Sequence, residues 1–133
     1  MLINLSNHPS TKWSPEQLAA AQVFGKVVDL PFPDVDPSGG EAYIRSLCES
    51  YLQKIDHISR DGASTVSMTC PVSEVTVHIM GEMTLTFALV NALQSRGTTC
   101  VASTTERIVT EANGVRTSAF HFRQFRKYTN NLP

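Results

Sequence analysis

Apolar residues recur along the chain at two spacings, which predict alternating strands and helices. Residues 75–80 form a short apolar and β-branched run that ends at Gly81, and this pattern predicts a buried strand. The apolar segment 83–93 is too long for a strand and is followed by Gly97, which predicts a buried helix. Residues 99–105 predict a second strand. Strand, tight turn, helix and strand form a βαβ unit, which builds a parallel sheet.

The N-terminal part of the chain has the same order of elements. Residues 2–5 and 27–30 predict two strands joined by a polar loop and a helix. The start of the helix is marked by Ser14 at the N-cap, Pro15 at the next position, and Gln17, which completes a capping box. The pattern therefore predicts two βαβ units.

Between the two units lies the clearest helical pattern. Apolar residues recur at three- and four-residue steps over 44–58, which predicts an amphipathic helix. Prolines within 31–37 predict a loop, because proline lacks a backbone donor. Residues 59–71 are ambiguous, and 65–68 fit either a short strand or a loop.

The C-terminal pattern predicts a hairpin. Asn113 and Gly114 stand between two β-prone runs, which is the strongest short signal for a β-hairpin. The residues from Lys127 onward are expected to fray. Together the elements predict one domain over residues 1–133. Its fold class is α/β and Rossmann-like, with a mainly parallel sheet flanked by helices and a C-terminal antiparallel hairpin.

Composition limits the class of protein. A length of 133 residues and a hydrophobic fraction of 41% suit one globular domain. No apolar run is long enough for a membrane span and no signal peptide is visible, so a cytoplasmic protein is expected. The three cysteines are far apart and lack metal-ligand spacing, which favours free thiols in a reducing cytoplasm.

The charge argues against binding to duplex nucleic acid. The formal net charge is −1, whereas proteins that coat nucleic acid are basic. The distribution is uneven, because acidic residues exceed basic ones over 1–66 and the reverse holds over 67–133. The C-terminal half therefore suits a small anionic ligand.

Ligands of open parallel sheets bind beyond the carboxyl ends of the strands, and three segments of this chain fall there. The first is Ser6, Asn7 and His8, which follow the first predicted strand. Their hydroxyl, amide and imidazole groups would contact a phosphate or a base. The other interpretation is a simple turn built from turn-forming residues.

The second segment holds Gly81, Glu82 and Thr84 at the start of a predicted helix. Backbone N–H groups and the helix dipole make such a position attractive to anions. No glycine-rich phosphate motif is present, however, and Glu82 would repel a phosphate unless it bonds a ribose hydroxyl. Glu82 fits equally well as the cap of the helix.

The third segment holds three consecutive hydroxyl groups, those of Ser103, Thr104 and Thr105. Arg107 follows them, and its guanidinium suits bidentate contact with phosphate. This segment is the preferred ligand site. The alternative is a loop entering the hairpin, with Arg107 paired to Glu106 or Glu111.

Two further residues have a functional and a structural interpretation. Trp13 lies in a polar loop, where it would stack on a base or pack against the first helix. His78 alternates with apolar residues and fits a hydrogen-bonded core histidine. No nucleophile elbow and no paired Cys/His motif occurs, so neither a metal nor a cofactor is expected.

These segments resemble a known family. The first strand with Ser6 and Asn7, the strand-to-helix turn at 75–84, the segment 103–107 and the closing hairpin are similar to the CRISPR-associated Rossmann-fold (CARF) domain. The similarity is to the small, single-domain CARF-like proteins encoded near type III CRISPR systems. It covers most of the chain in layout, through short motifs. The appended effector domain of many CARF proteins is absent from this sequence.

The resemblance implies a homodimer that binds a cyclic oligoadenylate across its two-fold axis. Members called ring nucleases cleave this ligand without a metal, by attack of a ribose 2′-hydroxyl on the neighbouring phosphate to give a 2′,3′-cyclic phosphate. We therefore expect binding and cleavage of cyclic oligoadenylate, with tetra-adenylate favoured. Arg107 would neutralise the phosphate, and His8 would transfer a proton. The ligand would be bound by Ser6, Asn7, Trp13, Gly81, Glu82, Thr84, Ser103, Thr104 and Thr105.

Two other functions fit the same residues. One is a non-catalytic sensor or adaptor that binds a cyclic nucleotide and passes its state to a partner. The other is a small metal-independent hydrolase that acts on a different phosphoester.

Overall fold

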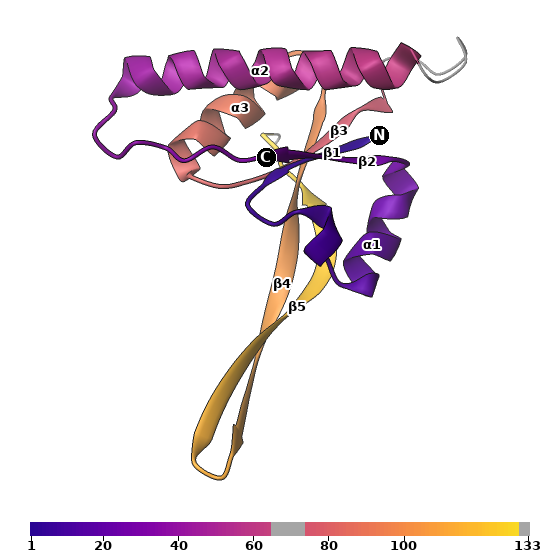
Figure 1. Cartoon of the computed structure of the whole chain (residues 1–133), viewed down its shortest axis with the longest axis vertical. Coiled ribbons are helices and arrows are strands. Elements are labelled where there is room, and N and C mark those ends of the chain that lie inside the picture. The colour runs from indigo at the N-terminus through magenta and orange to yellow at the C-terminus, as the bar shows by residue number, and fades with distance from the viewer. Residues whose placement is uncertain (65–73, 131–133) are drawn as a thin grey trace.

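The structure is a computed structural model that describes residues 1–64 and 74–130. Within these residues, five strands form one sheet, and three α-helices form a layer on each of its two faces (Figure 1). None of the helices in these two ranges has the length and hydrophobicity needed to cross a membrane. The ambiguous segment 65–68 and one of the three cysteines, Cys70, lie outside the described residues.

The five strands form a single sheet in the order β2-β1-β3-β4-β5. Its strands are β1 (Leu2–Ser6), β2 (Val27–Pro31), β3 (Thr76–Met80), β4 (Thr99–Ala112) and β5 (Val115–Lys127). The first four in this order are parallel, and β5 is antiparallel to β4. The predicted α/β class, its mainly parallel sheet and its C-terminal hairpin are therefore confirmed. The central position of β3, parallel to β1, follows from the two βαβ units.

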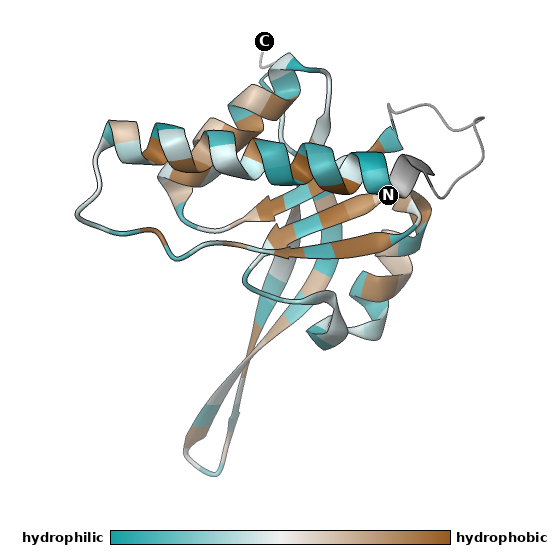
Figure 2. Ribbon diagram, turned by 45° about the horizontal axis from the view of Figure 1, so that its top comes forward, coloured by the Kyte–Doolittle hydropathy of each residue, from teal (hydrophilic) through white to brown (hydrophobic). Residues whose placement is uncertain are grey.

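The helices cover both faces of the sheet. They are α1 (Pro15–Ala21), α2 (Glu41–Ser64) and α3 (Met83–Ser95), with single turns of 3-10 helix at η1 (Ser10–Lys12) and η2 (Gln22–Phe24). The two longer helices lie on one face, and η1 and α1 lie on the other (Figures 1 and 2). The predicted start of α1 is confirmed, because the Ser14 hydroxyl accepts a hydrogen bond from the Gln17 amide at 3.2 Å.

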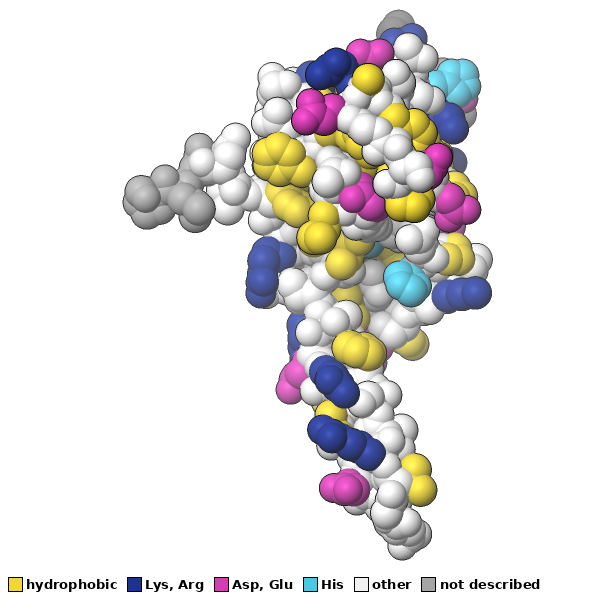
Figure 3. Space-filling model, turned by 90° about the vertical axis from the view of Figure 1, so that its left-hand side faces the viewer, with side chains coloured by type: hydrophobic (Ala, Val, Ile, Leu, Met, Phe, Trp, Pro, Cys, Tyr) yellow, Lys and Arg dark blue, Asp and Glu magenta, His cyan; other side chains and the backbone are white. Residues whose placement is uncertain are grey.

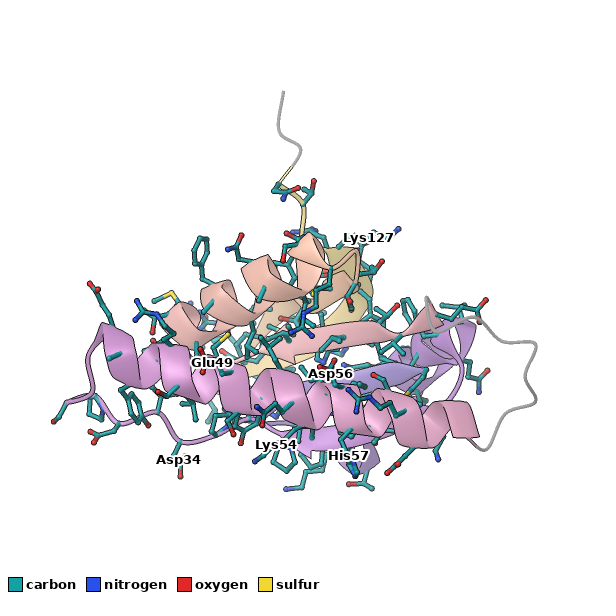
Figure 4. All side chains as sticks on the ribbon, turned by 90° about the horizontal axis from the view of Figure 1, so that it is seen from above. Asp34, Glu49, Lys54, Asp56, His57 and Lys127 are labelled. Carbon is teal, nitrogen blue, oxygen red and sulfur yellow. The ribbon has the colours of Figure 1, made fainter. Side chains whose placement is uncertain are left out.

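Alternation along the strands gives each face its own core. On the α2–α3 face, Ile3 and Leu5 of β1 and Val77 and Ile79 of β3 are fully buried against Leu89 and its neighbours on α3. Figure 4 shows α2 lying across α3, with Asp56 directed toward α3, where it pairs with Arg96 at 3.2 Å. The smaller core on the α1 face is formed by Leu2, Trp13, Ala21 and Val101.

The hairpin extends well beyond the sheet. Only residues 99–101 of β4 pair with β3, whereas residues 101–112 pair with β5. Residues 105–122 therefore project as a two-stranded arm, which Figure 1 shows leaving the body on the side of α1. The tip is the predicted Asn113-Gly114 turn, with φ of 54° and 76°. Two consecutive positive φ angles are typical of a type I′ hairpin turn.

Two expectations about the C-terminal region are wrong. The alternative of a loop over residues 103–107 is wrong, because the strand predicted over 99–105 continues as β4 to Ala112 and pairs with β5 across a β-bulge at Thr104/Thr105. The chain also does not fray directly after Lys127. The Tyr128 hydroxyl donates to the Ile79 carbonyl at 2.7 Å, and its amide donates to the Cys100 carbonyl at 2.9 Å. These bonds fasten the end of β5 to the body.

The α3 layer should carry much of the stability. Leu89 is fully buried, so we expect Leu89→Ala to lower the free energy of unfolding by about 2–5 kcal/mol. Phe87 lies on the same helix and is 75% exposed, so Phe87→Ala should change it by less than about 0.5 kcal/mol. Urea denaturation followed by circular dichroism measures both. Equal losses in the two variants would contradict this packing.

Candidate functional site

A row of polar side chains crosses the α1 face of the sheet near the carboxyl ends of the strands. The strand register places Asn4 of β1 directly between Asp29 of β2 and His78 of β3. The amino-terminal half of the same face is apolar, with Leu2 buried there. In a parallel sheet the carboxyl half is where ligands bind, so the row lies under the expected site.

The Asn4 side chain joins this row through four hydrogen bonds. Its Nδ2 donates to Asp29 Oδ1 at 2.8 Å and to the His8 carbonyl at 2.9 Å. Its Oδ1 accepts from the Ser6 hydroxyl at 2.8 Å and lies 2.8 Å from His78 Nδ1. Because both partners of Nδ2 are acceptors, the orientation of the amide is fixed. His78 Nδ1 must then carry the proton that bonds Asn4 Oδ1.

His78 is a neutral core histidine, as its pattern in the sequence predicts. Only 2% of it is exposed, and its ring meets Trp13 and Phe125 edge-on at centroid distances of 5.7 and 5.4 Å. Burial, helped by the charge of nearby His8, lowers the pKa of His78 to about 4. With the proton on Nδ1, Nε2 is free to accept from the Ser103 hydroxyl at 3.2 Å.

The row is connected through the His8 carbonyl and the Trp13 ring to a groove of about 350 Å³ between the η1–α1 segment and the arm. The first wall includes His8, Lys12 and Trp13, and the arm contributes Thr105, Phe120 and Phe122. Phe120 is 69% exposed. The groove therefore combines an imidazole, the cation of Lys12, the carboxylate of Glu16 and an exposed aromatic ring.

Strand alternation shows which arm side chains face the groove. Thr105 pairs with Phe122, and Arg107 pairs with Phe120, so these four side chains share one face of the ribbon. Arg107 thus lies one step farther out along the arm than the groove-lining residues. Its guanidinium donates to the Ser118 hydroxyl at 3.1 and 3.3 Å.

The opposite face of the arm carries its own charge pair. Glu106 pairs in register with His121, and Arg123 Nε donates to Glu106 Oε2 at 2.7 Å. The pairing expected between Arg107 and Glu106 is thus absent, since Glu106 is bound by Arg123. His121 and Arg123 border the groove, but alternation directs the His121 side chain to the far side of the ribbon. Figure 3 views the molecule from its carboxyl edge and shows Lys and Arg side chains spaced along the arm.

The structure favours the structural interpretation of Trp13. Its side chain is 7% exposed and packs with Leu2 and Val101 in the α1-face core. The indole Nε1 donates to the His8 carbonyl at 3.1 Å. Trp13 therefore forms the floor of the groove, and little of its ring is open to a base.

The N-terminus of α3 is capped by the side chain of Glu82. The Glu82 carboxylate accepts from the backbone N–H groups of Leu85 at 2.8 Å and Thr84 at 3.0 Å. These bonds, together with one from the Thr84 hydroxyl, lower the pKa of Glu82. A Cβ on Gly81 would lie 2.4 Å from the Phe32 ring, so glycine is required here for packing. This geometry favours the capping interpretation of Glu82.

The structure thus brings together some of the expected ligand residues. Ser6 and Ser103 join the polar row, and His8, Trp13 and Thr105 meet at the groove. Thr104 Oγ1 bonds the backbone of Gln124 across the ribbon. The exposed residue Asn7 borders a second hollow of about 270 Å³, which is also lined by Asn4, Ser6 and Asp29 of the polar row. Gly81, Glu82 and Thr84 lie at the start of α3, on the other face of the sheet.

Sequence reasoning missed Asn4, Asp29, Lys12 and Phe120. A signal existed for Asn4, which is a polar residue inside an apolar strand and is buried, because a buried polar group requires partners. Asp29 also interrupts an apolar strand, but it is exposed. No group of three or more His, Cys, Asp or Glu residues suited to a metal ion occurs within 1–64 and 74–130.

A family model described as "Uncharacterized protein MJ1673 family" matches residues 1–126. The chain belongs to the MJ1673 family. The match extends from β1 to the end of β5 but for its last residue, so the polar row, the groove and the arm are all within the part shared with the family. Nothing among curated proteins and nothing among solved structures matches the chain.

The buried His78 should make stability depend on pH. The unfolded state binds a proton near the ordinary pKa of 6.5, and the folded state binds it only near 4. The contribution of His78 is therefore complete above about pH 6.5 and falls by about 3 kcal/mol as the pH approaches 4. His78→Asn, which keeps a donor for Asn4, should flatten this decline. Urea unfolding at several pH values measures it, with His57→Ala on α2 as the control that keeps the parent profile (Figure 4).

Proposed function

We propose that the protein binds cyclic oligoadenylates, tetra-adenylate in particular, and cleaves them without a metal. The observation that carries this proposal is the groove where His8, Lys12 and the exposed ring of Phe120 meet, beyond the carboxyl end of the parallel sheet. The three groups are suited to the three parts of a nucleotide.

Each part of the ligand has a matching group. An adenine base would stack on Phe120, since base–aromatic stacking needs only an exposed ring face. Lys12, and Arg107 farther out on the arm, would attract the phosphates. Local cations are required, because the protein as a whole carries a formal charge of −1.

The reaction would be a transesterification within the ligand. The ribose 2′-oxygen attacks the adjacent phosphorus, the bond to the 5′-oxygen breaks, and a 2′,3′-cyclic phosphate and a 5′-hydroxyl result. His8 would take the proton from the 2′-hydroxyl, and water would supply a proton to the departing 5′-oxygen. Lys12 and Arg107 would stabilise the charge on the phosphate oxygens. Alignment of the attacking oxygen with the leaving oxygen would supply the rest of the acceleration.

A homodimer is part of this proposal. The groove volume of about 350 Å³ is near the lower end of ligand sites, roughly 300–1,000 Å³, and suits one nucleotide rather than a ring. A two-fold assembly would place two such grooves around one cyclic ligand. The exposed side chain of Phe120, which lines the groove, offers apolar surface for such an assembly. Light scattering that reports only monomer, with and without ligand, would contradict it.

The second candidate is a non-catalytic sensor or adaptor for the same ligand. One observation favours it: strand alternation directs His121 away from the groove, which leaves His8 as the one imidazole facing it among the described residues. A site with a single proton-transfer group is suited to binding as well as to slow cleavage.

Incubation with cyclic tetra- and hexa-adenylate, with and without chelator, separates these functions. Cleavage that survives the chelator is expected, with a 2′,3′-cyclic phosphate product seen by chromatography and mass spectrometry. His8→Ala should lower turnover by about 10²- to 10⁴-fold while the dissociation constant barely changes. His57→Ala, an exposed histidine on α2, is the matched control and should behave like the parent. Retained but intact ligand would instead identify a sensor, and no binding of either ring would refute both.

Arg107 tests the role of the arm. Its one described side-chain partner is the Ser118 hydroxyl, so the guanidinium carries an unneutralised charge beside Phe120. Arg107→Ala should weaken ligand binding by about 1.5–3 kcal/mol, as measured by calorimetry. Arg107→Lys should recover only part of this loss, because lysine keeps the charge without the fork. Arg116→Ala, nearer the tip of the arm, is the control. An unchanged affinity and turnover in Arg107→Ala would place Arg107 outside the site.

A further inference from the structure

His8 combines a fixed backbone with an exposed side chain. It lies two residues beyond the end of β1 and precedes Pro9, which restricts the backbone of the preceding residue to extended conformations. Its carbonyl oxygen is within hydrogen-bond distance of Asn4 Nδ2 at 2.9 Å, Trp13 Nε1 at 3.1 Å and Ser6 Oγ at 3.2 Å. A loop carbonyl at the surface would ordinarily bond water, so convergence of three side chains on it is a specific feature.

The chemistry of the donors distinguishes these three contacts. The Ser6 hydroxyl has one proton, and Asn4 Oδ1 is the closer acceptor at 2.8 Å. Ser6 Oγ also accepts from the His8 amide at 3.2 Å. Asn4 and Trp13 are therefore the two lasting donors to the His8 carbonyl, one for each lone pair. Together these two hydrogen bonds restrain the orientation of the His8 carbonyl.

Both donors are themselves held in place. Asn4 is 1% exposed, and its amide is oriented by Asp29 on one side and His78 on the other. Trp13 is 7% exposed and packs edge-on against His78. The rigidity of the sheet is thus transmitted to the His8 backbone through two buried side chains.

We infer that Asn4 and Trp13 are positioning residues, which hold the His8 imidazole at the groove through hydrogen bonds to the His8 carbonyl. The expected effect of this positioning on turnover rests on the proposed cleavage, whereas its expected effect on the order of the His8 backbone does not. A misplacement of about 1 Å in a reacting group can cost about 10²-fold in rate, so loss of one donor should cost between about 10- and 100-fold.

Trp13→Phe is the variant that tests the inference. It removes the Nε1 donor and retains an aromatic ring against His78, and Asn4 still satisfies the carbonyl, so the fold is preserved. Turnover should fall by about 10- to 100-fold while the Michaelis constant stays near that of the parent. Ser10→Ala is the matched control: it removes a side-chain hydrogen bond to Asp29 close to His8, but the Ser10 amide keeps its own bond to Asp29 and the donors to the His8 carbonyl are untouched.

A double-mutant cycle tests whether Trp13 acts through His8. In the His8→Ala background, Trp13→Phe should have no further effect on turnover. An equal loss in both backgrounds would overturn the inference, because the indole would then act on something other than His8.

Nuclear magnetic resonance supplies a readout that needs no substrate. The His8 amide should have an order parameter near that of rigid backbone, about 0.85, and Trp13→Phe should lower it toward 0.6 or below. Ser10→Ala should leave it unchanged. A rigid His8 in Trp13→Phe would overturn the inference even if the ligand is cleaved. A loosened His8 in a protein that cleaves nothing would support the positioning and refute only the proposed reaction.

Discussion

The structure depends on the hydrogen bonding of one buried amide, that of Asn4. An amide placed in the middle of a sheet is costly unless all its polar groups have partners. Asn4 meets this condition fully, because its two N–H groups and its carbonyl oxygen engage Asp29, His8, Ser6 and His78. The same four bonds join three strands and the loop after β1. A requirement for stability therefore also fixes the geometry of the candidate site.

This arrangement explains why the groove has one firm wall. The η1 segment is fastened to the sheet through Asp29, which accepts from the amide and hydroxyl of Ser10, and through Trp13 below it. The opposite wall is the arm, a two-stranded ribbon whose outer part packs against nothing in its own chain within the described residues. Isolated two-stranded hairpins are only marginally stable. A ligand or second copy that bridges the two walls would therefore order the arm rather than the loop.

Much of the fold could be predicted from the sequence because its signals are local. The capping box at Ser14, the Asn113-Gly114 turn and the two βαβ patterns each lie within a few neighbouring residues. The loop considered for residues 103–107 shows the limit of such local signals, because these residues are part of β4. Threonine suits strands and loops alike, and here the decision rests on antiparallel partners about twenty residues farther along the chain. Asn4 was missed for a similar reason, since its role arises from register across three strands.

The position of Glu82 decides where an anion can bind on this fold. In many parallel sheets a helix N-terminus supplies the attraction for phosphate. Here the Glu82 carboxylate already accepts from the first free N–H groups of α3, and a second anion would be repelled by its charge. In the proposed function the attraction would come instead from side-chain cations, and on the α1 face these are Lys12 and the arginines of the arm. The same glutamate that stabilises α3 would thus direct the proposed anionic ligand away from α3 and toward the α1-face groove.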